Sequence, residues 1–356
     1  MWLKPECGVT SNLWILLFLI LPAVCCTNLS PGNAVVLPEI PFEKLSEYHF
    51  FEEPLINLRP AERVLPYDLI TPLFSDYAQK ARFIWMPEGV SATLAEGEEI
   101  DFPVGTVLIK NFYYPADQNK QKTMVETRLL IKRENQWDPL TYIWNEEQND
   151  ASLEIAGDFR KINSHRPDGE EFTIDYSIPN LNQCKGCHER NRKVVPVGPT
   201  LENLNRTYAY QDGEKNQLEK WSELNYLNGL DPGADHDKLA DWSDPTAPLH
   251  DRALAYLQVN CGTCHHNEGP ANVSGLRLTT EEENLFNLGV NKPPVSAGKG
   301  SGGLKYDIVP GKPDESILVY RMESLEPGAM MPEMGRKLVH REGVQLIRKW
   351  IEEMEQ

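Results

Sequence analysis

The pentapeptide Cys-x-x-Cys-His occurs twice in this chain, at residues 184–188 and at residues 261–265. Two thiols three positions apart can each add to a vinyl group of one porphyrin, and the adjacent imidazole can bind the iron of that porphyrin. With 7 cysteines and 8 histidines in 356 residues, chance would give about 0.003 copies of the pattern. The sequence therefore predicts two covalently bound c-type haems, with iron held by His188 and His265. The four attachment residues are Cys184, Cys187, Cys261 and Cys264.

Zinc sites and redox-active dithiols also use Cys-x-x-Cys pairs, and both remain alternatives to haem. Such a pair can be half of a zinc site, but zinc does not require a His directly after each second Cys. A thioredoxin-like dithiol also lacks that His and is normally found once, in a βαβ context. The doubled pattern favours haem over both.

The first 26 residues have the layout of a secretory signal peptide. Lys4 precedes an apolar run at residues 13–21, and small residues follow around Ala23. This run is shorter than the roughly 20 residues of a membrane-spanning helix. We therefore expect export to the periplasm, where c-type haem is attached. Lipoprotein cleavage at the pair Cys25-Cys26, or a retained anchor, stays open, and membrane contact is expected only in those forms.

The net charge of −18 narrows the class of partner. It argues against nucleic acid, whose phosphates would repel an acidic protein. It suits brief docking with basic redox proteins, although acidity also keeps an exported protein soluble. After the leader, every remaining Cys belongs to one of the two motifs, so we expect no structural disulfide.

The chain that follows the leader is long enough for two domains, and its pattern predicts an α+β fold. Residues 27–197 favour an antiparallel β-rich domain that ends in the first motif, because β-branched and aromatic residues dominate and no long helix separates the runs. Residues 198–249 are polar and turn-rich, which predicts a connector with a short helix at 217–224. Residues 250–356 are expected to form a second, all-α domain. The expected strands lie at residues 106–113, 125–132, 137–144 and 172–178.

The β-rich part resembles a known family of haem proteins. Residues 105–110 read Gly-Thr-Val-Leu-Ile-Lys, a strand pair with a Trp at its turn follows, and the first motif closes the segment. This order is similar to that of the cytochrome c′-beta family and its hydroxylamine-oxidising relatives, over about residues 102–190. The resemblance implies an antiparallel β-fold that holds its haem at the C-terminal side of the domain.

The C-terminal part resembles class I cytochrome c. A helix expected at residues 251–259 leads straight into Cys261, and apolar residues recur at helical spacing between residues 341 and 354. The resemblance implies an all-α domain over residues 250–356, in which two terminal helices cross beside the haem.

The same resemblance implies a distal methionine ligand for the second haem. The family ligand typically precedes Pro, which selects Met331, with Met330 as the fallback and Met334 as a residue lining the pocket. It also implies that a backbone carbonyl at Gly269-Pro270 accepts the Nδ1–H of His265. A thioether ligand favours ferrous iron, so a His and Met pair implies a raised reduction potential and electron transfer.

The distal ligand of the first haem is not evident from the sequence. Met86, Met124, His165, Lys110 and several tyrosines are available, and no spacing selects one of them. A sixth protein ligand would make this a second electron-transfer haem. An open site could instead bind a small molecule such as NO or a peroxide.

Two functions are therefore expected to compete. The first is an exported dihaem carrier that transfers electrons between redox partners. The second is a haem enzyme or gas-binding protein, peroxidase-like or NO-binding, whose open first haem is fed by the second. The whole chain is similar to bacterial exported dihaem c-type cytochromes, with the likeness carried by residues 71–77, 182–188 and 292–295. This layout favours the carrier over the enzyme.

Overall fold

A computed structural model describes Met1 and residues 34–95, 99–115, 121–231 and 234–355. Apart from Met1, the expected signal peptide at residues 1–26 lies outside the described residues. From residue 34 onward, the described chain belongs to one compact unit. None of its helices is both long enough and apolar enough to cross a membrane.

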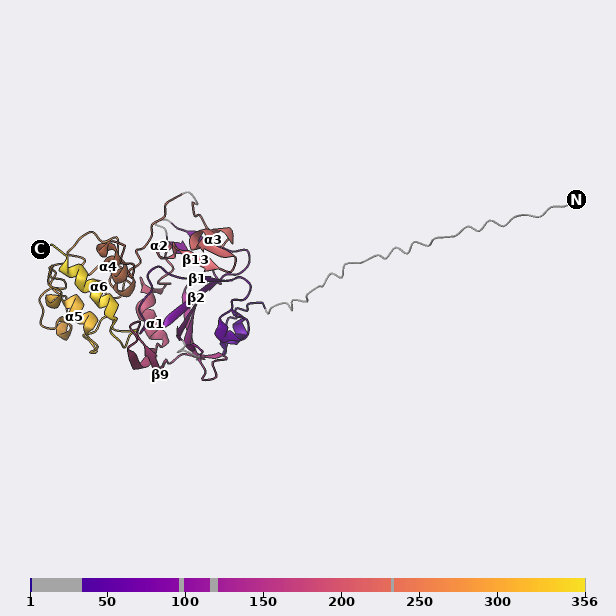
Figure 1. The fold of residues 1–356 in the computed structure, drawn as a ribbon, viewed down its shortest axis with the longest axis horizontal. Helices are drawn as coiled ribbons and strands as arrows, with labels where there is room; N and C mark the ends of the chain where they lie inside the picture. The colour runs from indigo at the N-terminus through magenta and orange to yellow at the C-terminus, as the bar shows by residue number, and fades with distance from the viewer. Residues whose placement is uncertain (2–33, 96–98, 116–120, 232–233, 356) are drawn as a thin grey trace. The chain divides into compact units, whose positions relative to one another are not determined.

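The largest sheet has six antiparallel strands in the order β1-β2-β5-β6-β7-β8. It lies on the other side of this compact unit from the C-terminal helices (Figure 1). Strands β5, β6 and β7 follow one another in the sequence and are neighbours in the sheet. Antiparallel strands can be joined by short hairpin connections, which makes this arrangement possible. Arg133, for example, donates its backbone N–H to Gln136 O over 2.8 Å and closes the turn between β6 and β7. The strands are β1 (Val64–Tyr67), β2 (Gln79–Trp85), β5 (Val107–Tyr114), β6 (Thr123–Lys132), β7 (Trp137–Trp144) and β8 (Ala151–Glu154).

Each face of this sheet buries its own apolar row, because successive side chains on a strand point to opposite faces. On one face, Phe83, Ile109 and Leu129 are cross-strand partners. They pack under the N-terminal segment that contains the short helices η1 (Leu45–Tyr48) and η2 (Leu55–Asn57). On the other face, the cross-strand partners are Ile84, Leu108 and Leu130.

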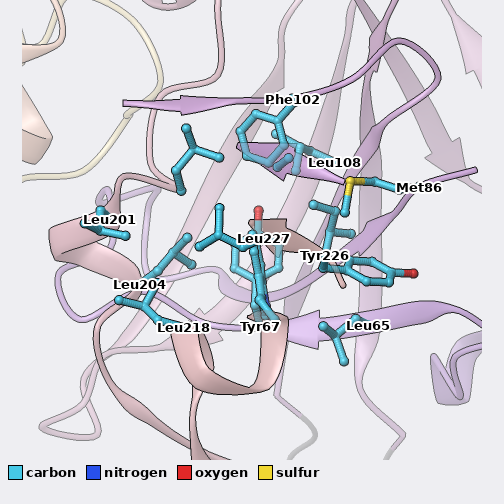
Figure 2. Close-up of a cluster of buried hydrophobic side chains, with 14 of the residues drawn as sticks. Leu65, Tyr67, Met86, Phe102, Leu108, Leu201, Leu204, Leu218, Tyr226 and Leu227 are labelled. Carbon is cyan, nitrogen blue, oxygen red and sulfur yellow. The ribbon is translucent and has the colours of Figure 1, made fainter. Parts of the chain in front are cut away.

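The segment at 198–249, expected as a connector, covers this second face. Its buried residues pack with those of the sheet in one cluster (Figure 2). Trp221 is fully buried and meets Tyr67 edge-on, with ring centroids 5.7 Å apart. The elements are α2 (Leu201–Leu204), β13 (Thr207–Tyr210), β14 (Gly213–Asn216), α3 (Gln217–Glu223) and β15 (Leu227–Asn228), which pairs with β3 (Ala92–Leu94) beside β4 (Ile100–Asp101).

A hairpin and a short helix follow the main sheet. The hairpin strands β9 (Asp158–His165) and β10 (Glu171–Ile178) lead through Pro179 into α1 (Leu181–His188). Asn180 caps α1, because its side chain accepts the N–H of Gln183 over 2.9 Å while Gln183 Oε1 accepts the N–H of Asn180 over 2.9 Å. Two small strands, β11 (Glu189–Arg190) and β12 (Lys193–Val194), then return the chain.

The expected fold class, an α+β chain ending in an all-α class I cytochrome c domain, is wrong. The described residues contain fifteen strands, mostly antiparallel, and six α-helices of at most 12 residues. The C-terminal helices α4 (Leu249–Leu257), α5 (Ile317–Glu323) and α6 (Arg341–Glu352) are separated by long irregular stretches (Figure 1). The Gly- and Pro-rich segment at 293–303 cannot continue a helix. Between α4 and α5 the chain forms two isolated β-bridges and the short helical turns η3 (Gln258–Gly262), η4 (Asn272–Ser274), η5 (Gly298–Ser301) and η6 (Pro313–Glu315).

Helices α4 and α6 pack against each other at a glycine. Gly343 lies in the first turn of α6, and a Cβ added there would overlap the ring and hydroxyl of Tyr256 on α4. Tyr256 and Ile347 are buried in the core that these helices share. The close approach of the two helices therefore requires glycine at this position.

Gly343→Ala is expected to destabilise the protein by about 1–3 kcal/mol, because overpacking outweighs the gain in helix propensity. Urea denaturation measures the change. Glu352→Ala, an exposed position on the same helix, serves as the control and should change the free energy of unfolding by less than about 0.5 kcal/mol. A more stable Gly343→Ala variant would show that the two helices do not approach closely.

Candidate cofactor-binding site

One cavity contains side chains from both Cys-x-x-Cys-His motifs. Cys184, Cys187 and His188 enter it from α1, whereas Cys261 and Cys264 enter it from the end of η3 and the turn that follows. Strands β5, β6 and β7 and the loop before α6 supply further walls. The thiols of two motifs that lie 77 positions apart in the sequence therefore face a common space.

Helix α1 presents both thiols of the first motif on one side, since positions three apart share a helix face. Cys184 contacts the Thr141 side chain on β7, and burial raises the pKa of its thiol. Burial also raises the pKa of the Cys261 thiol in the second motif, to about 12. All four motif cysteines are half-buried and free of disulfides. Each is therefore a free cysteine that remains available for thioether formation.

The imidazole of His188 is held in one tautomer. Its Nδ1 lies 2.8 Å from Val195 O, and a carbonyl can only accept, so Nδ1 carries the proton. The Nε2 atom then keeps its lone pair. Burial lowers the pKa of His188 to about 4, which leaves the ring neutral at physiological pH. A neutral ring with a free Nε2 is the form that binds a metal.

His265 in the second motif has the same arrangement with different partners. Its Nδ1 lies 3.0 Å from Ser274 Oγ, which itself donates to Ala271 O over 2.7 Å and therefore accepts from the imidazole. Lys292 Nζ donates to Ser274 O over 2.8 Å and so stabilises this turn. Burial lowers the pKa of His265 to about 4. The partner is thus the hydroxyl of Ser274, and not the carbonyl at Gly269-Pro270 that the sequence suggested.

The two motifs touch each other at their second cysteines. The thiols of Cys187 and Cys264 are hydrogen-bonded, which lowers the pKa of Cys264 and raises that of Cys187. Cys264 Sγ also lies 3.8 Å from Gly186 O inside the first motif. An ion pair between Arg190 and Glu268 ties the ends of the two motifs together. Groups attached to Cys187 and Cys264 would therefore be neighbours.

The loop before α6 places two methionines at the cavity. Met331, the expected iron ligand, lines the cavity together with Cys261 and Cys264, and so does Met334. Met330 is buried elsewhere and does not line it. His265 is not among the described residues that line this cavity, so the cavity brings Met331 together with the cysteines of the second motif but not with its histidine.

Asp76, which sequence reasoning missed, holds this loop in place. It is buried, and its Oδ1 accepts the backbone N–H of Lys337 over 2.7 Å and of Leu338 over 2.8 Å. Close by, Phe74 donates its N–H to the side chain of Asn260, directly before the second motif, over 2.9 Å. The segment before β2 therefore positions both the methionine loop and the second motif.

The structure separates the residues considered for the distal side of the first haem. Met86 and Met124 are buried in the two cores on opposite faces of the sheet, and His165 ends β9. Lys110 lines the cavity together with His188. Tyr67 and Tyr176 also line it, and Tyr176 donates its hydroxyl to Glu126 over 2.8 Å.

No family model, curated protein or solved structure that was compared with this chain matches it. Within the described ranges, no three His, Cys, Asp or Glu side chains converge on a point where they could hold a metal ion by themselves.

His340, another cavity-lining residue, predicts a pH dependence of folding. Its ring stacks on Phe74 at 4.2 Å and its Nδ1 lies 3.0 Å from the Tyr256 hydroxyl. Burial lowers its pKa from 6.5 to about 3. The unfolded chain takes up this proton below about pH 6.5 while the folded chain does not. The free energy of unfolding should therefore fall as the pH falls through this window.

Urea denaturation at pH 7 and pH 5 checks the effect. The loss of stability between these pH values should be about 2 kcal/mol smaller in His340→Gln than in the wild type. An equal loss in both proteins would mean that His340 is protonated in the folded state.

Proposed function

We propose that this chain is an exported dihaem c-type cytochrome that transfers electrons between redox protein partners. The observation that carries the proposal is the shared cavity, in which the thiols of Cys187 and Cys264 are hydrogen-bonded. Two redox groups attached at contacting residues can exchange electrons without large motions of the protein.

The residues of the two motifs would hold two covalently attached haems. Cys184 and Cys187 would hold the first through thioether bonds, and Cys261 and Cys264 would hold the second. His188 and His265 are neutral with Nδ1 occupied, which leaves each Nε2 for an iron. Iron in these groups would take up and release one electron at a time.

The methionine loop supports electron transfer over oxygen chemistry at the second haem. The Met331 thioether is a soft ligand that stabilises ferrous iron. Arg336 Nη2 donates to Met331 O over 2.8 Å, and Met331 N donates to Arg321 O over 2.9 Å, so the backbone at this residue is held on both sides. A fixed ligand keeps the geometry similar in both oxidation states.

The charge of the chain supports protein partners in the exported compartment. A net charge of −18 would steer a basic redox partner toward the surface and speed their encounter at low salt. The signal-peptide pattern at residues 1–26 supports a periplasmic location, because c-type haem is attached there.

Replacement of Met331 tests the proposal. Met331→Leu should abolish the weak near-infrared band of ferric haem with His and Met ligands, and should lower one of two reduction potentials, because the thioether no longer stabilises ferrous iron. Optical spectra and a redox titration of the purified protein measure both changes. Met334→Leu is the matched control, since Met334 lines the same cavity, and it should keep the band. A band that persists in Met331→Leu, or is absent from the wild type, contradicts the assignment.

A further inference from the structure

A row of basic side chains crosses the face of the main sheet beside the cavity. Arg82 on β2, Lys110 on β5 and Arg128 on β6 are cross-strand partners, so all three point to one face. Neighbouring strands are about 4.8 Å apart, and like charges directly opposite each other destabilise a sheet. Lys110 and Arg128 line the cavity. Such an arrangement is costly unless negative charge lies close by.

The outer two members of the row have carboxylate partners. Arg82 Nη1 lies 2.6 Å from Asp68 Oδ1, and Arg128 Nη2 lies 2.5 Å from Glu126 Oε1. Asp68 is shared, because Arg206 Nη1 also lies 3.4 Å from its other oxygen. Even so, Arg82 Nη2 is buried without a hydrogen-bond partner. The carboxylates therefore pair Arg128 at two atoms but leave part of the Arg82 guanidinium unsatisfied.

The central member of the row has no carboxylate partner. In the part of the chain that the structure describes, Lys110 Nζ makes no ion pair, and its nearest aromatic contact is the Phe112 ring at 4.9 Å. Burial, together with Arg82, Lys80 and Arg128, holds the pKa of Lys110 well below its usual value, while Glu126 acts in the opposite direction. On the same face, burial lowers the pKa of Lys80 to about 7. A carboxylate bound beside Lys110 would favour its charged form.

The absence of a carboxylate partner for Lys110 among the described residues contrasts with the net charge of −18 that the chain carries. Acidic proteins have many carboxylates with which to neutralise a buried cation, and burying an uncompensated cation is expensive. A cationic wall on a cavity is instead the complement of an anionic occupant, as at carboxylate and phosphate sites. The cavity wall thus indicates negative charge on the group that binds there.

The row also lies at a defined place relative to the first motif. Thr141 on β7 is the next cross-strand partner after Arg128, and its side chain contacts Cys184. Lys110 is therefore two strand spacings from Thr141, roughly 10 Å along the sheet. A haem attached through Cys184 carries its propionates on the side opposite to its vinyl groups, so they would extend away from this thiol.

We propose that Lys110, between Arg82 and Arg128, is the centre of an anion-binding subsite that takes a carboxylate group in the cavity. The carboxylate could come from two sources, a propionate of the haem at the first motif or a free small carboxylate. The first source rests on the proposed function, whereas the second does not. Lys110 donates to the carboxylate, and the flanking guanidinium groups add positive charge from both sides.

The test compares Lys110→Gln, which removes the charge, with Lys110→Arg, which keeps it. Lys161→Gln, which changes an exposed residue of β9, is the matched control.

Haem content by pyridine haemochrome is measured first in the wild type and reports on the proposed function alone. Redox titration then reports on the subsite. Loss of a cation beside a propionate should favour the oxidised haem about tenfold, which lowers one of the two potentials by about 59 mV. Lys110→Arg and Lys161→Gln should keep the wild-type values.

Sodium acetate at constant ionic strength distinguishes the two sources. If a propionate occupies the subsite, acetate leaves the wild-type potentials unchanged and Lys110→Gln alone lowers one of them. If the occupant is a free carboxylate, acetate raises the melting temperature of the wild type and not that of Lys110→Gln, whether or not haem is present. The proposal would be overturned if Lys110→Gln and the wild type had the same reduction potentials and the same change in melting temperature with acetate. Conversion of one haem from low to high spin in Lys110→Gln would also overturn it, because Lys110 would then be an iron ligand.

Discussion

The site depends on the carboxylate of Asp76, which joins the β-rich and the C-terminal parts of the chain. By accepting two backbone N–H groups of the loop before α6, this one side chain fixes where Met331 lies relative to the sheet. The neighbouring bond from Phe74 to Asn260 fixes the second Cys-x-x-Cys-His motif in the same way. These contacts act together with the ion pair between Arg190 and Glu268, and Cys187 and Cys264 meet in one cavity.

Burial shapes the chemistry of the two motifs and of the cavity in two opposite ways. It keeps His188 and His265 neutral, which suits them to bind iron, and each ring has its Nδ1 proton engaged by a neighbour. It also encloses a row of basic side chains centred on Lys110, which makes no ion pair in the described part of the chain. A porphyrin with an iron and two propionates would suit both features. Its iron could bind the neutral imidazoles, and its propionates could pair with the basic row.

Local pattern in the sequence was enough to predict some of these features. The β-branched runs predicted β5, β6 and β7 to within two residues at their ends. The two motifs identified their four cysteines and His188 as cavity residues, whereas His265 does not line the cavity. Local pattern misled for the C-terminal part, because periodic segments at its two ends were extended to an all-α domain across a Gly- and Pro-rich middle. Long-range contacts were not predictable. The partner of His265, the role of Asp76 and the alignment of Arg82 with Lys110 depend on strand register and on residues distant in the sequence.

The intact mass of the exported protein, measured after denaturation, tests the central claim most directly. Denaturation removes any group that is not covalently bound, so only thioether-linked haem adds to the mass of the chain. Two haems per chain are expected, and replacing both cysteines of either motif should leave one. A wild-type chain with a single haem, or with none, would contradict the assignment of both motifs to one dihaem site.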